Sequence, residues 1–132
     1  MISRKTDYAL RSLVYLAGRE RGEWVSTTEL SRQLNAPRGF LAKIFQALIR
    51  RRILASGRGK NGGVRLRRQG ISLLEVIQAL EPTFSLNKCL DGEFTCFMER
   101  DCSVHNILGG VQKELFNRLK GITLQAAASR SN

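Results

Sequence analysis

Residues 35–66 read NAPRGFLAKIFQALIRRRILASGRGKNGGVRL. Pro37 suits the first turn of a helix, because its missing N–H group would have no helical partner there. The apolar residues that follow recur at helical spacing and predict one buried face: Phe40, Leu41, Ile44, Leu48 and Ile49. The opposite face presents polar and basic side chains: Arg38, Lys43, Gln46 and Arg50.

The second half of this stretch predicts a β-hairpin. Residues 53–55 and 64–67 are short apolar strands, and the loop between them is rich in glycine and basic residues. Glycines allow positive φ and let backbone N–H groups approach phosphates, while Arg58 and Lys60 extend along a groove. Asn61 belongs to the same loop. We call this hairpin the wing.

A further helix is predicted before this stretch. Residues 26–29, STTE, form a capping box, in which the hydroxyl and the carboxyl each satisfy a free helix N–H group, and the helix continues to about Leu34. Two short helices joined by a tight turn, with basic side chains outward on the second, indicate a helix-turn-helix. An amphipathic helix over residues 5–19 precedes them.

The C-terminal half predicts three more segments. A second capping box at residues 72–75 begins a helix that ends near Leu80, and residues 83–101 show no periodicity. Apolar residues then recur at alternating threes and fours: Val104, Leu108, Val111, Leu115, Leu119 and Ile122. Such a stripe predicts a long helix that packs on another helix, either in a homodimer or against the first helix of the same chain. A short helix over residues 124–128 ends the chain.

Together these elements predict a mainly α fold: a winged helix-turn-helix with a small β-hairpin and a long C-terminal dimerisation helix. We assign residues 1–82 to the DNA-binding domain. Residues 83–102 form the cysteine loop, and residues 103–132 form the dimerisation helix and tail.

Charge is concentrated in the first half of the chain. Residues 1–70 hold 16 Lys and Arg against 4 Asp and Glu, a net of +12, whereas residues 71–132 hold 6 against 7, a net of −1. A one-sided basic field favours a polyanion ligand. Duplex DNA is favoured over a membrane surface, because basic membrane helices expose a wide apolar face with aromatics. We expect DNA to be contacted by the polar face of the helix that follows Pro37 and by the wing, through Arg38, Lys43, Gln46, Arg50, Arg58, Lys60 and Asn61. No apolar run could span a bilayer and no signal peptide is evident, so we expect a cytoplasmic protein.

The three cysteines and the only histidine occur in one window. Cys89, Cys96, Cys102 and His105 form the pattern C-x6-C-x5-C-x2-H. This clustering favours a metal site over three small buried apolar side chains. Structural zinc usually binds cysteines two to four residues apart, and the wider spacing suits an iron–sulfur cluster. Sensing by thiol oxidation or by zinc remains the alternative.

Three motifs carry a family resemblance: residues 6–11 (TDYALR), wing residues 58–66 (RGKNGGVRL) and the three-cysteine loop. Over nearly the whole chain, the sequence resembles the iron-sulfur winged-helix regulators that include IscR, NsrR and RirA. The resemblance implies a dimeric repressor or activator that binds operator DNA according to a [2Fe-2S] or [4Fe-4S] cluster. The cysteines match the family's ligands and Arg58 matches its wing arginine. Pro37 departs from the family, where a serine is common.

The resemblance implies two candidates for the fourth ligand. His105 matches the histidine of IscR-like members, and Asp7 matches the carboxylate of NsrR-like members, which comes from the partner subunit. Without a ligand role, Asp7 is a favourable charge at a helix N-terminus and His105 a surface residue. Either ligand would bind iron less firmly than a thiolate, which leaves one iron open to nitric oxide or oxygen.

An enzyme is not expected from this sequence. Catalysis would need a nucleophile with a base, or paired carboxylates, beside a pocket, and the only histidine lies next to the cysteine loop.

Overall fold

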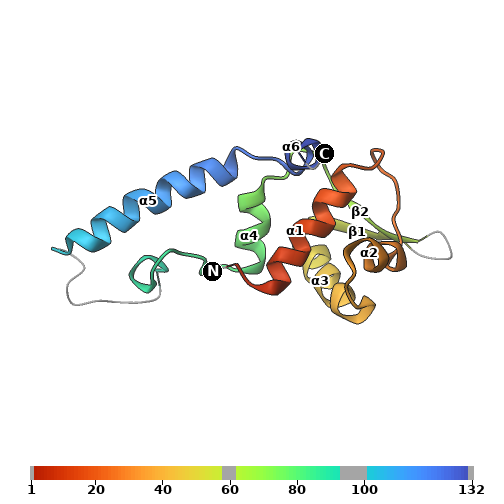
Figure 1. Ribbon diagram of the computed structural model, residues 1–132, viewed down its shortest axis with the longest axis horizontal. Coiled ribbons are helices and arrows are strands. Elements are labelled where there is room, and N and C mark those ends of the chain that lie inside the picture. Colours follow the sequence, from red (N-terminus) through yellow and green to blue (C-terminus); the bar gives the residue numbers. More distant parts are fainter. Residues whose placement is uncertain (1, 58–61, 93–100, 131–132) are drawn as a thin grey trace.

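The computed structural model describes residues 2–57, 62–92 and 101–130. In chain order its elements are α1 (Arg4–Ala17), α2 (Thr27–Leu34), α3 (Arg38–Arg50), β1 (Leu54–Gly57), β2 (Gly63–Leu66), α4 (Leu73–Leu80), the 3-10 helix η1 (Lys88–Leu90), α5 (Ser103–Lys120) and α6 (Leu124–Ser129). Figure 1 shows α1 to α4, the hairpin and α6 gathered in one body, from which α5 projects. The predicted fold class, mainly helical with an antiparallel hairpin, is confirmed.

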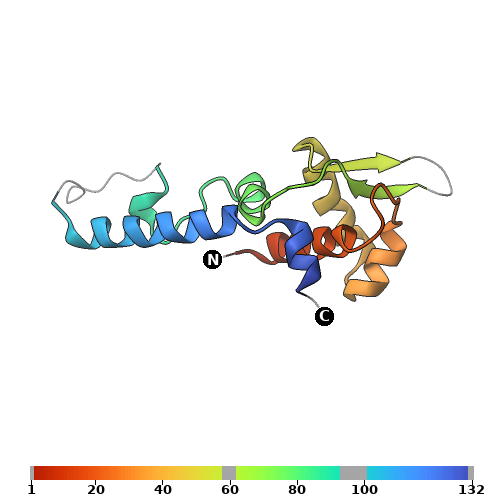
Figure 2. The same cartoon turned by 90° about the horizontal axis from the view of Figure 1, so that it is seen from above.

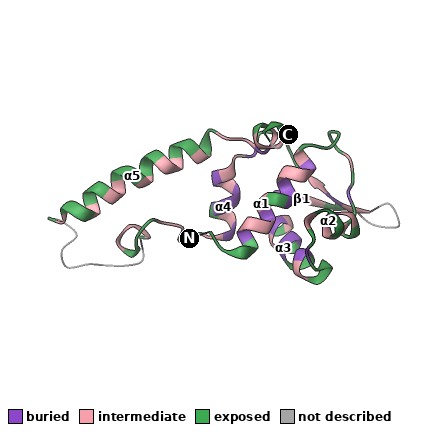
Figure 3. Cartoon of the chain, viewed as in Figure 1, coloured by how far each residue is buried: buried purple, intermediate pink, exposed green. Residues whose placement is uncertain are grey.

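Helix α1 lies at the centre of the body and packs against α2, α3, α4 and α6. Leu13 of α1, Leu41 and Leu48 of α3 and Leu124 of α6 are all fully buried in one core. Figure 3 shows that the buried residues concentrate in this body, whereas α5 has none. Helix α6 therefore belongs to the same core as the helix-turn-helix, whereas α5 does not.

The hairpin is anchored to the body by Val25, two residues before α2. Val25 and Val64 exchange two backbone hydrogen bonds, of 3.0 and 2.9 Å, so residue 25 pairs with β2 on the side away from β1. Gly63 has φ +142°, and a Cβ atom there would lie 2.2 Å from the Val25 carbonyl oxygen. Only glycine permits this approach. The strands begin and end within two residues of the predicted ones; Ile53 is instead buried beneath the end of α3, where its N–H bonds to Leu48.

Both predicted capping boxes form by half. The Ser26 and Ser72 hydroxyls accept hydrogen bonds from the Glu29 and Glu75 amides, at 3.0 and 3.1 Å. The two carboxylates do not return the bond as predicted, because other partners compete for them. Glu29 accepts the Tyr15 hydroxyl at 2.6 Å, and Glu75 pairs with Arg68. The hydrogen bond to Glu29, followed by burial, raises the pKa of Tyr15 above its ordinary value.

The segment after α4 is more ordered than its lack of periodicity predicts. Phe84 stacks on Phe116 of α5 at 5.8 Å between ring centroids, and the Leu86 amide donates to the Gln112 side chain at 2.9 Å. Further along, η1 packs against α5 near Gly109. Figure 2 shows this segment running beside α5. Its contacts are non-local, so no helical or strand repeat marks them in the sequence.

The apolar residues of α5 divide between two environments. Val104, Ile107 and Val111 are 56, 64 and 49% exposed, whereas Leu115 and Leu119 are half-buried. Ile107 is the most exposed of the three, and the predicted apolar stripe did not include it. Helix α5 packs against α4 and η1, and not mainly against α1 as the intramolecular alternative required.

Candidate DNA-binding surface and cysteine site

Helix α3 presents a basic face to solvent. It buries Leu41, Ile44, Phe45 and Leu48 and exposes all four residues predicted to contact DNA: Arg38, Lys43, Gln46 and Arg50. Arg51 and Arg52 follow the helix and are also exposed, and sequence reasoning omitted them although the run of three arginines was visible. The helix has no acidic residue in its first turn. This face can therefore approach a polyanion without local repulsion.

The first turn of α3 has no side-chain cap. Pro37 occupies the N-cap position without a side-chain hydrogen bond, and Gly39 is open to solvent. The N–H groups at a helix start need acceptors from outside the helix, and an anion can supply them. Where the resembling family often has a serine, Pro37 offers no side-chain cap, so the N–H groups of this turn are available to a phosphate.

A groove of about 280 Å³ separates α3 from the hairpin. Its lining includes Thr27 of α2, Ala42 and Gln46 of α3, and Ser56 and Gly57 of β1. These small or polar groups suit close approach of a sugar–phosphate backbone, and Phe45, Ile49 and Val64 add apolar surface beside them.

Trp24 fixes the base of the wing. Its ring covers Gly57, where a Cβ atom would lie only 3.1 Å away, and it remains 37% exposed. The Arg65 guanidinium lies 4.3 Å from the Trp24 ring centroid and donates to the Gly22 carbonyl at 3.3 Å. Three predicted DNA contacts, Arg58, Lys60 and Asn61, lie outside the described residues.

Two of the three cysteines are described, and both are associated with the first half of α5. Cys102 is the N-cap residue of α5, and its sulfur accepts the His105 N–H at 3.5 Å. Cys89 lies in η1, which packs against the same helix. Both are half-buried free thiols. Cys96 lies outside the described residues.

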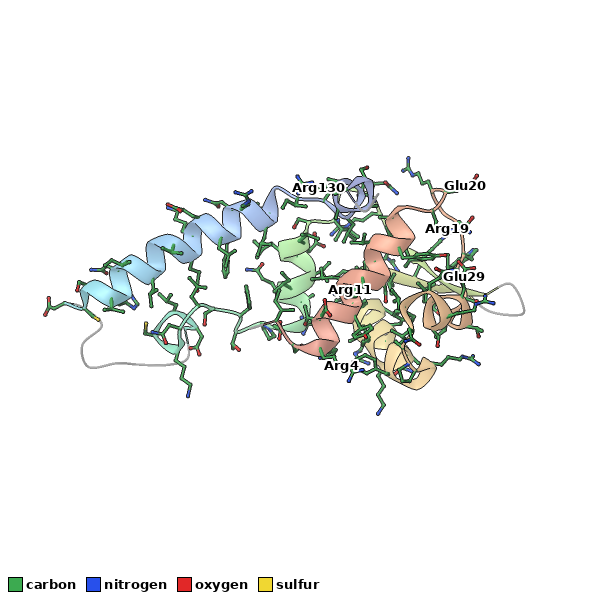
Figure 4. All side chains as sticks on the ribbon, in the orientation of Figure 1. Arg4, Arg11, Arg19, Glu20, Glu29 and Arg130 are labelled. Carbon is green, nitrogen blue, oxygen red and sulfur yellow. The ribbon has the colours of Figure 1, made fainter. Side chains whose placement is uncertain are left out.

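The two candidates for a fourth ligand are in different environments. The Nδ1 atom of His105 is buried and has no hydrogen-bond partner within residues 2–57, 62–92 and 101–130. Both carboxylate oxygens of Asp7 lie 3.1 Å from Arg11 Nε in an exposed ion pair on α1. Figure 4 places Arg11 in the body and thus away from the projecting α5. The buried imidazole nitrogen is therefore available as a metal ligand, whereas Asp7 is paired with Arg11 of its own chain.

The described side chains alone do not complete a metal site. Among them, no three His, Cys, Asp or Glu residues gather in a group able to hold a metal ion. Within the same residues, no helix is long and apolar enough to cross a membrane.

Comparison with known proteins places this fold. Residues 2–130 match the Rrf2 family model, described as iron-dependent transcriptional regulator. The chain is 34% identical to protein aau3 of Rhizobium meliloti, over 93% of this chain and 81% of that protein. It is 29% identical to the HTH-type transcriptional regulator NsrR of Bacillus licheniformis, over 94 and 89%. The structure of CymR, the global cysteine regulator of B. subtilis, aligns with a TM-score of 0.78 at 25% identity, covering 100 and 98%.

Proposed function

Because the chain belongs to the Rrf2 family of transcriptional regulators, we propose that it is a cytoplasmic homodimer that regulates transcription according to a cysteine-ligated iron–sulfur cluster. The family consists of DNA-binding regulators and not of enzymes. The observation that carries the proposal is that one chain combines a basic, exposed α3 with two free thiols and a buried imidazole nitrogen near α5, which has no hydrogen-bond partner among the described residues.

DNA binding is assigned to α3 and the wing. The exposed Arg38, Lys43 and Arg50 and the uncapped first turn supply the charge and the N–H donors that phosphates require. Gln46, beside the groove, offers an amide suited to a base edge. Arg58, Lys60 and Asn61 would extend this surface along the wing.

A salt titration tests this assignment. Each phosphate contact contributes about 0.9 to the slope of log affinity against log salt. Because the proposed dimer carries each substitution twice, the Lys43→Ala/Arg50→Ala variant should reduce the slope by about 3.6, if both side chains of each protomer contact phosphates. Lys113→Ala/Arg118→Ala removes the same charge from exposed positions on α5 and should leave the slope unchanged. Salt-insensitive binding by the wild type, or equal slopes for the two variants, would contradict the assignment.

Cys89, Cys96 and Cys102 are the proposed cluster ligands. The ligand residues that the structure describes fit such a group: Cys89 and Cys102 are free thiols, and the buried Nδ1 of His105, one turn from Cys102, has no hydrogen-bond partner among the described residues. The cluster would supply redox or ligand-exchange chemistry, and the protein would supply its ligands and shield them. The alternative is sensing by thiol oxidation or by zinc without a cluster, and the similar fold of CymR, the global cysteine regulator of B. subtilis, is compatible with it.

Anaerobic purification separates these alternatives. A cluster predicts coloured protein with iron and acid-labile sulfide, and Cys102→Ser should remove both. The fourth ligand follows from a pair of single variants. If His105→Ala changes the visible spectrum and Asp7→Ala does not, His105 is the ligand; the reverse result assigns the partner's Asp7. Colourless protein that cannot be reconstituted would leave the thiol or zinc sensor standing.

The homodimer is proposed to form through α5. An 18-residue helix without a buried residue, exposing Val104, Ile107 and Val111, needs an apolar partner surface, and a second copy supplies the same face. Ile107→Lys should yield monomers in sedimentation at a concentration where the wild type is dimeric. Asn117→Lys, at another exposed position of α5, is the matched control. A monomeric wild type at micromolar concentration would refute the dimer.

The proposed division of tasks is residues 1–82 for DNA, 83–102 for the cluster and 103–132 for dimerisation. Leu124 of α6 is buried in the same core as α1 and α3, so the three segments have different proposed roles but belong to one folded unit.

A further inference from the structure

The start of α1 is tied to the end of α4. The Ser3 backbone N–H donates to Glu81 Oε1 at 3.1 Å. Glu81 is the C-cap residue of α4, and its other oxygen, Oε2, is buried without a hydrogen-bond partner in the described part of the chain. The segment that carries Cys89 begins directly after it, and Phe84 N–H bonds to the Glu81 carbonyl at 3.0 Å. Glu81 therefore joins α1, α4 and the cysteine segment.

Arg4, the residue after Ser3, contacts helix α3. The Arg4 guanidinium carbon lies 5.5 Å from the Tyr8 ring centroid and 5.3 Å from that of Phe40. The two rings meet edge to face at 5.5 Å between centroids. Figure 4 shows Arg4 at the end of α1 that lies beside α3. Cation–π contacts of this kind hold a cation against both rings.

Phe40 is in the first turn of α3, where no side chain caps the helix. The orientation of that turn thus depends on how Phe40 packs against Tyr8 and Arg4. Arg4 is in turn the first residue of α1, and helix ends fray unless something holds them. The Ser3 hydroxyl, which accepts from the Thr6 amide at 3.2 Å, and the Glu81 carboxylate both help to hold this end.

We infer that Glu81 is a positioning residue for DNA binding: by holding the Ser3 amide it keeps Arg4 against Phe40 and fixes the first turn of α3. This inference rests on the proposed use of α3 to bind DNA. Glu81 itself touches no DNA. Since it is also the first residue of the connection to Cys89, a rearrangement of that segment reaches α3 by this path, which would connect sensing to DNA affinity.

Spatial connection alone does not demonstrate coupling, so the test measures it. The probe is a duplex that the wild type selects from a random-sequence pool. Glu81→Ala should weaken its binding by about three- to tenfold, the factor that one net hydrogen bond supplies. Amide resonances of residues 38–41 should shift in the same variant. Glu81→Gln keeps an oxygen acceptor for Ser3 and should restore both, while urea unfolding reports whether each variant is folded.

Glu75→Ala is the matched control, because Glu75 is also on α4 and pairs with Arg68 instead of α1. It should leave the affinity and the α3 resonances unchanged. In a double-mutant cycle, adding Glu81→Ala to Phe40→Leu should cost less than about twofold, because both changes interrupt one path.

Additive losses in the cycle would overturn the inference. Unmoved α3 resonances in Glu81→Ala would overturn it as well, as would binding within about twofold of the wild type. A wild type that selects no duplex would instead refute the proposed DNA binding, and the resonance comparison would still decide whether Glu81 acts on α3.

Discussion

Replacing Gly63 with alanine tests the attachment of the wing to the body. Gly63 begins β2 with φ +142°, and an added Cβ atom would lie 2.2 Å from the Val25 carbonyl oxygen and 2.6 Å from its carbon. Both neighbours are backbone atoms, so no side-chain rotation can relieve the overlap. The hairpin must move away from residue 25 or the protein must remain strained.

Two contributions set the size of the effect. A non-glycine residue at this φ costs about 1–3 kcal/mol. Moving β2 away breaks the two Val25–Val64 hydrogen bonds, which are worth about 0.5–1.5 kcal/mol each. Gly63→Ala should therefore lower the free energy of unfolding by about 2–6 kcal/mol, a large share of the ~5–15 kcal/mol of a typical domain.

Urea unfolding followed by circular dichroism measures this loss, and Gly39→Ala is the control. Gly39 is also near the DNA-binding surface, but it is exposed and helical, and a Cβ atom added there would have no neighbour within 4 Å. Alanine there should be neutral or stabilise by up to about 1 kcal/mol. A Gly63→Ala variant within about 1 kcal/mol of the wild type would refute the close approach of β2 to residue 25.

Three further changes test other contacts by the same unfolding measurement. Leu124→Ala should lower the free energy of unfolding by about 2–5 kcal/mol, because this side chain is fully buried in the body. A loss below about 1 kcal/mol would contradict the packing of α6 in the core. Tyr15→Phe removes the hydrogen bond to Glu29 and should cost about 1–2 kcal/mol. Because the pKa of Tyr15 is raised, this difference should be full below pH ~10 and disappear as the pH rises through the raised pKa; a difference independent of pH would contradict the assigned bond. Trp24→Leu should cost at least about 0.5–1 kcal/mol, because it removes both the Arg65 contact and the ring that covers Gly57. An Arg65→Leu background should reduce that loss by the share of the Arg65 contact, and an equal loss in both backgrounds would contradict the contact.

Local sequence signals predicted the parts of the fold that local physics determines. The Ser26 and Ser72 hydroxyls cap their helices as the motif requires, and the exposed face of α3 follows from the 3.6-residue spacing of its apolar side chains. The bonds made by the Glu29 and Glu75 carboxylates did not follow the motif. Each bonds to a side chain that the fold brings near, 14 residues away for Tyr15 and 7 for Arg68.

The same distinction applies to the candidate site. The spacing of the cysteines identified one window of the chain, but the course of residues 84–92 along α5 depends on contacts such as Phe84 with Phe116. Likewise, the sequence could not show that His105 Nδ1 is buried without a hydrogen-bond partner among the described residues, because this depends on its three-dimensional surroundings. Ile107 was missed because exposure depends on which face of α5 the segment and α4 cover.

We propose that the affinity of this protein for DNA depends on the state of its cysteine site. The most direct measurement is the affinity of anaerobically purified protein for its selected duplex, before and after a chelator removes the iron. If the cysteine site controls DNA binding, the two affinities should differ by about 5- to 150-fold, the range of a typical allosteric coupling. Equal affinities in protein shown to hold and then lose iron would contradict it.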